Sequence, residues 1–182
     1  EAFIVDLSNG NYTLIEKKVV IEGQKTAYFS EKFLEITVPV TTKEQIKEIK
    51  KTVTHIAKKH DEEPYKALAT TQQAIFHQLE EQDEIDAAAI FDKVFEEKPL
   101  AREAAQLAIT EERVPEKIAV TNVPKYERKY SKQKFKLDNG IEITIPSEIY
   151  ENKEMVEFIN NPDGSVSVLI KNIESILNKF NA

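Results

Sequence analysis

Residues 42–56 have the sequence TKEQIKEIKKTVTHI, and its apolar residues return every three or four positions. An α-helix completes a turn in about 3.6 residues, so one side of it would collect Ile46, Ile49, Val53 and Ile56. The lysines between them fall beside or opposite this stripe. The stretch therefore predicts an amphipathic helix that buries one face in a core and exposes a cationic one.

Helix-start signals predict three further helices downstream. Pro64 fits the first turn of one of them. Asp86 fits the N-cap of the next, with Ile85 and Ile90 placed to pack across it as a hydrophobic staple. Pro99 fits the first turn of the fourth. We therefore expect a cluster of about four helices within residues 41–114.

Strand and turn signals fill residues 1–40. Ser8-Asn9-Gly10-Asn11 separates two apolar runs, and Glu22-Gly23-Gln24-Lys25 precedes a short strand expected near residues 27–29. A strand that includes residues 35–38 would end at Pro39, which has no N–H to donate. We therefore predict a β-meander. Because the chain begins without Met in a strand-like run, we expect this meander to belong to a domain truncated at its N-terminus.

Two hairpins are predicted in residues 134–182. Asp138-Asn139-Gly140 lies between apolar runs at 135–137 and 141–145, and Asn-Gly suits a tight turn. Asn161-Pro162-Asp163-Gly164 would join residues 156–159 to 166–170. Asn172 is placed to cap a short terminal helix with an apolar face made of Ile173, Ile176, Leu177 and Phe180.

Together these signals predict an α+β fold. We expect an N-terminal β-meander over residues 1–40, a helical region over 41–114, a basic connector over 115–133 and a C-terminal β-rich unit over 134–182 with a short terminal helix. The connector is expected because residues 115–133 contain two prolines and little periodicity.

Composition excludes several classes of function. The 182 residues contain no cysteine and four glycines, which excludes disulfides, thiolate metal sites and a Gly-rich nucleotide loop. No run of about 18 apolar residues is present, so we expect no membrane span. The sequence has no basic and apolar leader, so we expect a cytosolic protein. No cofactor and no small-molecule substrate are expected.

The charge is unevenly distributed, although the net charge is −7. Residues 43–60 carry six lysines against two glutamates, and residues 80–98 carry eight acidic residues against two lysines. Residues 125–136 carry six cations, one glutamate and three aromatic residues. Cations attract phosphates and aromatic faces stack on bases, so this last cluster favours nucleic acid. Its candidate DNA-binding residues are Lys125, Arg128, Lys129, Tyr130, Lys132, Lys134 and Lys136.

The same cluster has a plainer interpretation. If residues 134–137 form a strand, Lys134 and Lys136 share one face while Phe135 and Leu137 share the other. That is the ordinary alternation of a half-buried strand. The lysines of residues 43–60 likewise suit the solvated face of a surface helix.

Catalytic patterns are weaker. Asp6 on the first strand with Glu16 and Lys18 on the second has the pattern of a Mg²⁺-dependent nuclease, which we keep as an alternative. His60-Asp61 lacks the further ligands of a metal phosphohydrolase, and no two histidines have the spacing of a helical zinc site. A helix-turn-helix over residues 86–112 is rejected because its acidic flanks would repel phosphate. We therefore predict no enzyme and no bound metal.

Several stretches are shared with a known family. They are AFIVD at 2–6, YTLIEKK at 12–18, YFSEKFL at 28–34, the helical block at 68–95, FKLDNGIEITIP at 135–146 and GSVSVLIK at 164–171. With them, nearly the whole chain resembles the C-terminal part of the bacterial nucleoid-associated protein family (NdpA-like). The resemblance implies a cytoplasmic, nucleoid-localised DNA-binding protein and supplies no catalytic residue.

The expected function is sequence-tolerant, electrostatic binding of the DNA phosphate backbone by the 125–136 cations, aided by Lys47, Lys50, Lys51, Lys58 and Lys59. RNA is a second possible ligand, and a homo-oligomer is expected because unpaired strand edges favour association. The first alternative is a structural or oligomerisation module without DNA contact, with the acidic 80–98 region as its docking surface. The second alternative is the Mg²⁺-dependent nuclease.

Overall fold

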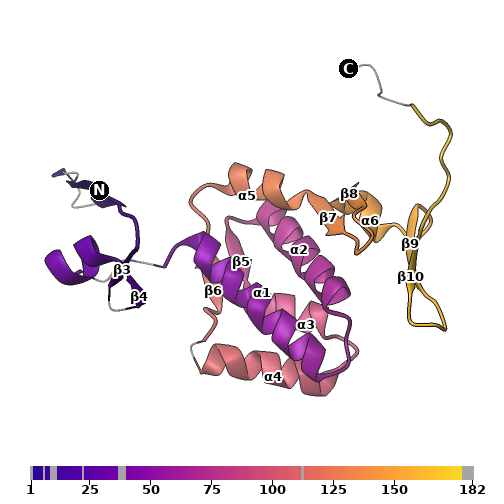
Figure 1. Ribbon diagram of the computed structural model, residues 1–182, viewed down its shortest axis with the longest axis horizontal. Coiled ribbons are helices and arrows are strands. Elements are labelled where there is room, and N and C mark those ends of the chain that lie inside the picture. Colours follow the sequence, from indigo (N-terminus) through magenta and orange to yellow (C-terminus); the bar gives the residue numbers. More distant parts are fainter. Residues whose placement is uncertain are drawn as a thin grey trace. The chain divides into compact units, whose positions relative to one another are not determined.

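The computed structural model describes residues 2–5, 7–8, 12–21, 23–36, 40–111 and 113–177. The chain divides into two compact units, residues 1–41 and residues 42–182. Helices and small antiparallel sheets occur together in it, which confirms the predicted α+β class (Figure 1). Among the described helices, none is both long enough and apolar enough to cross a membrane.

The first unit contains two separate hairpins. Strand β1 (Ala2–Val5) pairs with β2 (Tyr12–Ile15), and β3 (Val19–Ile21) pairs with β4 (Gln24–Thr26), each pair antiparallel. Each hairpin is a two-stranded sheet of its own, so the continuous meander that the sequence predicted is wrong in this respect. The predicted turn at Asn9–Asn11 lies outside the described residues.

A π-helix, η1 (Tyr28–Phe33), follows the second hairpin where a strand was predicted near residues 27–29. The Glu16 carboxylate accepts hydrogen bonds from the backbone N–H groups of Phe29 and Ser30 and, at 2.6 Å, from the Ser30 hydroxyl. These bonds satisfy N–H groups that a helix start leaves without partners. The expected strand over 35–38 is absent at Glu35 and Ile36, and its remaining residues lie outside the described ones.

The second unit has a helical core, and its four central helices confirm the predicted cluster (Figure 1). They are α1 (Thr42–Lys59), α2 (Pro64–Glu81), α3 (Ala87–Val94) and α4 (Pro99–Thr110). The stripe predicted on α1 is buried, with Ile49 and Val53 fully inaccessible. Asp86 caps α3 as predicted, because its carboxylate accepts the Ala89 N–H at 2.9 Å. Ile85 and Ile90 are both fully buried beside this cap.

The predicted connector over residues 115–133 has regular structure, so that prediction is wrong. Strand β6 (Lys117–Ala119) pairs with β5 (Glu84–Asp86), and the paired Ile118 and Ile85 are buried in the core. Helix α5 (Val123–Tyr130) is capped by Asn122, whose side chain accepts the Lys125 N–H. These elements are three and eight residues long, too short to give a readable period.

Both hairpins predicted near the C-terminus are confirmed. Strand β7 (Lys132–Lys136) pairs with β8 (Glu142–Pro146), and β9 (Val156–Asn160) pairs with β10 (Val166–Ile170). Gly140 has φ +89°, the conformation that made Asn-Gly a turn signal. A short helix that the sequence did not predict, α6 (Ser147–Glu151), follows β8. The predicted terminal helix is wrong over residues 171–177, which have no regular structure, and Phe180 lies outside the described residues.

Candidate nucleic-acid interface

Hydrogen bonds to α2 fix the segment that joins α5 to β7. The Tyr130 carbonyl accepts from the Gln72 side chain at 3.2 Å and from the Ser147 hydroxyl at 2.8 Å. Gln72 also donates to the Lys132 carbonyl at 2.7 Å. The buried Gln133 donates to the Ala69 carbonyl at 3.0 Å. The basic segment, residues 125–136, is therefore attached to the helical core through its backbone, and its lysine side chains remain available to contact a ligand.

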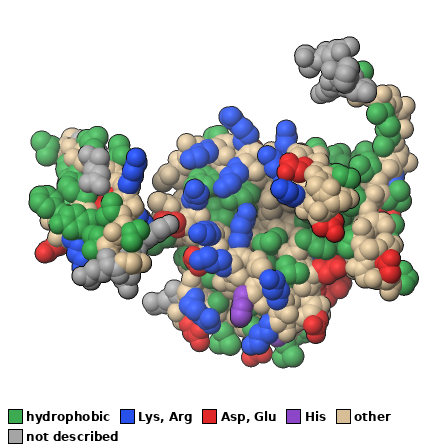
Figure 2. All heavy atoms as spheres, in the orientation of Figure 1, with side chains coloured by type: hydrophobic (Ala, Val, Ile, Leu, Met, Phe, Trp, Pro, Cys, Tyr) green, Lys and Arg blue, Asp and Glu red, His purple; other side chains and the backbone are tan. Residues whose placement is uncertain are grey.

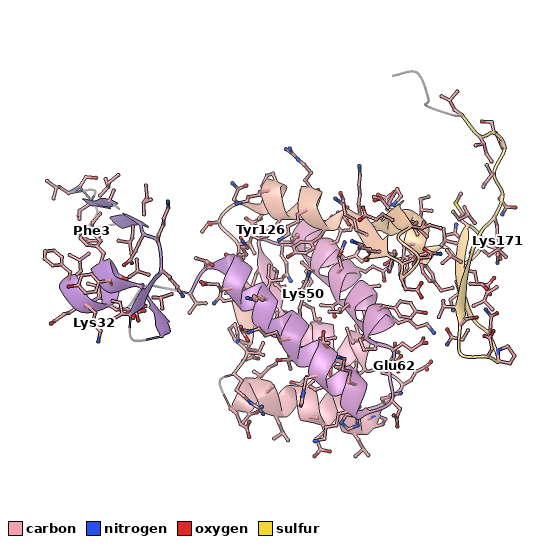
Figure 3. All side chains as sticks on the ribbon, viewed as in Figure 1. Phe3, Lys32, Lys50, Glu62, Tyr126 and Lys171 are labelled. Carbon is pink, nitrogen blue, oxygen red and sulfur yellow. The ribbon has the colours of Figure 1, made fainter. Side chains whose placement is uncertain are left out.

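Two tyrosines arrange the lysines of α5. Tyr126 and Tyr130 stack with ring centroids 6.4 Å apart, and the Lys129 ammonium lies over both rings at 5.9 and 5.2 Å. Lys50 of α1 reaches the Tyr130 ring from the other helix, also at 5.2 Å. Lys50 and Tyr126 are labelled on their helices in Figure 3. Cation–π attraction thus holds α1 and α5 lysines around one ring.

The electrostatics of this contact are visible in two pKa shifts. Burial lowers the pKa of Lys50, and the neighbouring Lys129 charge lowers it further. Burial, with a smaller contribution from Tyr126, raises the pKa of Tyr130 to about 12. Both shifts have the direction expected where burial disfavours the charged form. The smaller contribution to the Lys50 shift comes from a single second cation, Lys129.

We call the surface that carries these lysines the cationic face. Nine of its members are exposed and Lys50 is half-buried. Over the described part of the chain, Lys51 is the member that forms an ion pair, with Glu48 at 2.7 Å. Figure 2 shows Lys and Arg side chains gathered over α1 and α5. The members are Lys47, Lys50, Lys51 and Lys58 of α1, Lys125, Arg128 and Lys129 of α5, and Lys132, Lys134 and Lys136 of β7.

A groove with a volume of about 1140 Å³ lies against this face. Six lysines line it, four from α1 and two from β7, and Asp138 is the one carboxylate among the residues around it. We call it the lysine-rimmed groove. The lysines are Lys47, Lys50, Lys51, Lys58, Lys134 and Lys136. Two basic clusters that lie far apart in the sequence therefore border a single concave surface.

The structure gives each residue predicted to bind DNA a definite place. Lys125, Arg128, Lys129, Lys132, Lys134 and Lys136 are exposed, whereas Tyr130 is 2 % exposed and cannot stack on a ligand base. Strand alternation is present as well, because Gln133 is buried and Phe135 half-buried between exposed lysines. The strand β7 therefore shows the ordinary alternation of buried and exposed residues and still presents its lysines on a cationic surface. Lys59, which was expected to assist, is exposed at the end of α1 and does not line the groove.

Several acidic residues of the 80–98 region already cap a helix or face a basic side chain of the same chain. Asp86 caps α3, and Glu84 pairs with Lys117 at 2.8 Å. Glu80 faces His77 at 3.4 Å, and Asp92 faces Arg102 at 3.9 Å. Docking of a partner on this region stays a prediction.

The residues of the nuclease alternative are only partly described. Glu16 is engaged with the start of η1, and Asp6 lies outside the described residues. Across the described ranges, no group of three His, Asp or Glu side chains could hold a metal ion. The nuclease therefore stays a prediction without geometric support.

Sequence reasoning missed the aromatic residues of the groove. Tyr65 of α2, Phe135 of β7 and Phe158 of β9 line it, and only Phe135 belongs to the basic cluster. The Phe158 ring lies 5.1 Å from Phe135 and 5.9 Å from Tyr65, measured between centroids. Spacing along the chain gives no signal for such a cluster, because three separate elements contribute to it.

A family model described as nucleoid-associated protein YejK matches residues 1–178. No curated protein and no solved structure matches the chain.

Proposed function

Because the chain belongs to the nucleoid-associated protein family, we propose that it binds the phosphate backbone of duplex DNA through the cationic face. The nucleoid is the DNA-containing region of the bacterial cytoplasm, so family membership also places the protein where DNA is present. The proposal requires no catalytic step and no cofactor.

The observation that carries the proposal is that ten cations gather on one surface of a protein with net charge −7. Nine of the ten cations of the face form no ion pair within the described residues. A basic surface on an acidic protein orients the molecule, because the rest of it is repelled by phosphate. Each lysine that meets a phosphate releases condensed counterions, which supplies the binding free energy.

Low dependence on base sequence follows from the residue types. Nine of the ten members of the face are lysines, which bind phosphates as mobile point charges. Bidentate readout of guanine in the major groove uses mainly arginine. The face therefore suits contacts that position a duplex and carry no sequence information.

The experiment is a salt titration of duplex binding by the full chain and a triple variant, Lys129→Glu, Lys132→Glu and Lys134→Glu. For every phosphate that the variant no longer neutralises, the plot of log K against log salt becomes less steep by about 0.9. The matched control reverses three exposed lysines outside the face, Lys32, Lys93 and Lys153, and retains the wild-type slope. Unchanged affinity and slope in the first triple variant would overturn the proposal.

Self-association is a second candidate function, supported by the surface of residues 1–41. Large apolar side chains are exposed there, including Leu7 at 94 %, Phe33 at 69 % and Val20 at 66 %. Exposed apolar side chains on short hairpins favour pairing with a second copy. Light scattering tests this: a dimer that Val20→Lys dissociates supports it, and a wild-type monomer at high concentration contradicts it.

A further inference from the structure

The floor of the lysine-rimmed groove is apolar and partly aromatic. Tyr65 and Leu68 of α2, Phe135 of β7, Phe158 of β9 and Val168 of β10 all line it. A duplex keeps its bases stacked inside and presents phosphates, so its backbone gains nothing from such a floor. The rim suits phosphate, whereas the floor suits a flat apolar group.

The aromatic rings of the floor are held in place by their neighbours. Phe135 lies 5.6 Å from Tyr150 as well as 5.1 Å from Phe158, and Tyr150 and Phe158 are 5.6 Å apart, measured between centroids. The rings of Phe135 and Phe158 are half-buried, so each packs on one side and still borders the groove. Rings that are already ordered lose little conformational freedom when a ligand stacks on them.

Polar groups with both donor and acceptor atoms also border the groove. Gln72 and Asn139 line it beside the aromatic residues. The Gln72 amide already donates to the Tyr130 and Lys132 carbonyls, and the Asn139 oxygen accepts the Ile141 N–H. Within the described part of the chain, the Gln72 oxygen and the Asn139 amide N–H groups are left for a ligand. Amide groups can bond to the edges of unpaired bases. An acidic amphipathic helix would use the lysines and the apolar floor, but its backbone N–H and C=O groups are bonded within the helix, so only its side chains could reach these amides.

We propose that the lysine-rimmed groove binds an unpaired strand of nucleic acid, with its bases stacked on Phe135 and Phe158 and its phosphates on the lysines. This inference rests on the proposed function, because the same lysines supply the attraction to phosphate. It adds a second ligand class to a surface that otherwise holds a duplex. Positively charged grooves that carry aromatic stacking platforms are the usual form of single-strand sites.

The test compares two ligands that have the same charge. One is an oligothymidylate of about 12 nucleotides, within the site sizes of single-strand binders, and the other is an abasic strand of that length. The wild-type chain is expected to bind the oligothymidylate more tightly than the abasic strand, by roughly 5- to 150-fold for each stacked base. Phe135→Leu keeps the floor apolar but removes one ring, and it should reduce this preference by that factor without changing duplex affinity.

The control variant is Phe33→Leu, which removes an exposed ring from residues 1–41. It is expected to keep both the duplex affinity and the preference for bases. A second measurement does not depend on the stability of any variant. Ultraviolet cross-linking of oligothymidylate to the wild-type chain, followed by peptide mass spectrometry, should label peptides that contain Phe135 or Phe158.

Different failures have different meanings. Equal affinity for the two strands, or cross-links confined to other peptides, overturns this inference while duplex binding by the cationic face stands. Displacement of the abasic strand by an acidic amphipathic peptide, with no preference for bases, assigns the groove to a peptide and also overturns it. Absence of duplex binding at low salt overturns the proposed function itself.

Discussion

Lys50 of α1 and Lys129 of α5 each place an ammonium nitrogen 5.2 Å from the centroid of the same Tyr130 ring. The two like charges around one ring repel each other, and the attraction of each to the ring offsets part of that cost. The repulsion contributes to the lowered pKa of Lys50, after its burial. If the proposed function holds, a phosphate close to both ammonium groups would offset this repulsion.

Removal of one charge should change the titration of the other. Lys129→Met takes away the positive charge beside Lys50, so the pKa of Lys50 rises toward its ordinary value of 10.5 but stays below it because burial persists. The pKa is read from the side-chain carbon shifts of Lys50 in an NMR titration. Lys93→Met, on α3, is the control and should leave the Lys50 titration as it is in the wild type. An unchanged Lys50 titration in Lys129→Met would show that the two charges are not coupled.

Tyr130 should make the fold sensitive to alkali. Its pKa is raised from 10.0 to about 12, so between these values the unfolded chain has lost the phenolic proton and the folded chain keeps it. The unfolded state then binds fewer protons, and the free energy of unfolding falls as pH rises through this window. The fall due to Tyr130 should be about 2 kcal/mol, after allowance for residual solvent screening.

Urea unfolding below and above this window measures the effect. Tyr130→Phe cannot ionise, so its loss of stability with rising pH should be smaller than that of the wild type by the same amount. Tyr28→Phe changes an exposed tyrosine and should retain the wild-type pH dependence. Identical pH dependence in Tyr130→Phe and the wild type would contradict the assignment.

A substitution at Gln133 should lower stability without changing DNA binding. Gln133 is 2 % exposed and lies between Lys132 and Lys134. Gln133→Ala removes the bond to the Ala69 carbonyl and leaves a cavity, and it should cost roughly 1–3 kcal/mol of unfolding free energy. The charges of the face are untouched, so the salt slope of duplex binding should stay the same. Gln82→Ala changes an exposed glutamine and should alter stability by less than about 0.5 kcal/mol. A reduced salt slope in Gln133→Ala would mean that this residue also orients the lysines.

The predictable parts of the fold are those in which local sequence carries the physical cause. Ile46, Ile49 and Val53 recur at helical spacing and are buried, and Asp86 caps the helix that follows it. The Asn-Gly turn at Gly140 needs a positive φ that glycine adopts without strain. Helix α5 was not predicted, because its eight residues are too few to give a readable period.

The candidate site was predictable in part for the same reason. The 125–136 cations are adjacent in the sequence, so composition alone identified them. Their position beside the α1 lysines depends on how the basic segment packs against α2, where Gln72 donates to the Tyr130 and Lys132 carbonyls. Burial of Tyr130 follows from that junction, so an aromatic residue expected to meet the ligand instead positions Lys50 and Lys129.

The start of η1 should depend on the ionisation of Glu16. Burial raises the pKa of this carboxyl, but hydrogen bonds from Ser30 and Phe29, together with the charge of Lys18, outweigh it and lower the pKa below its ordinary value of 4.5. Between the two values the unfolded chain binds the extra proton, so the stabilisation is complete above 4.5 and is lost as pH falls through the lowered pKa. Hydrogen exchange at the Phe29 and Ser30 amides should therefore accelerate in that acidic range, relative to its intrinsic rate.

Glu16→Gln should lose this pH dependence because its amide does not titrate, whereas Glu31→Gln, an exposed change within η1, should keep it. Acid-dependent exchange that persists in Glu16→Gln would assign the effect to another carboxylate and leave Glu16 available for the metal role of the nuclease alternative.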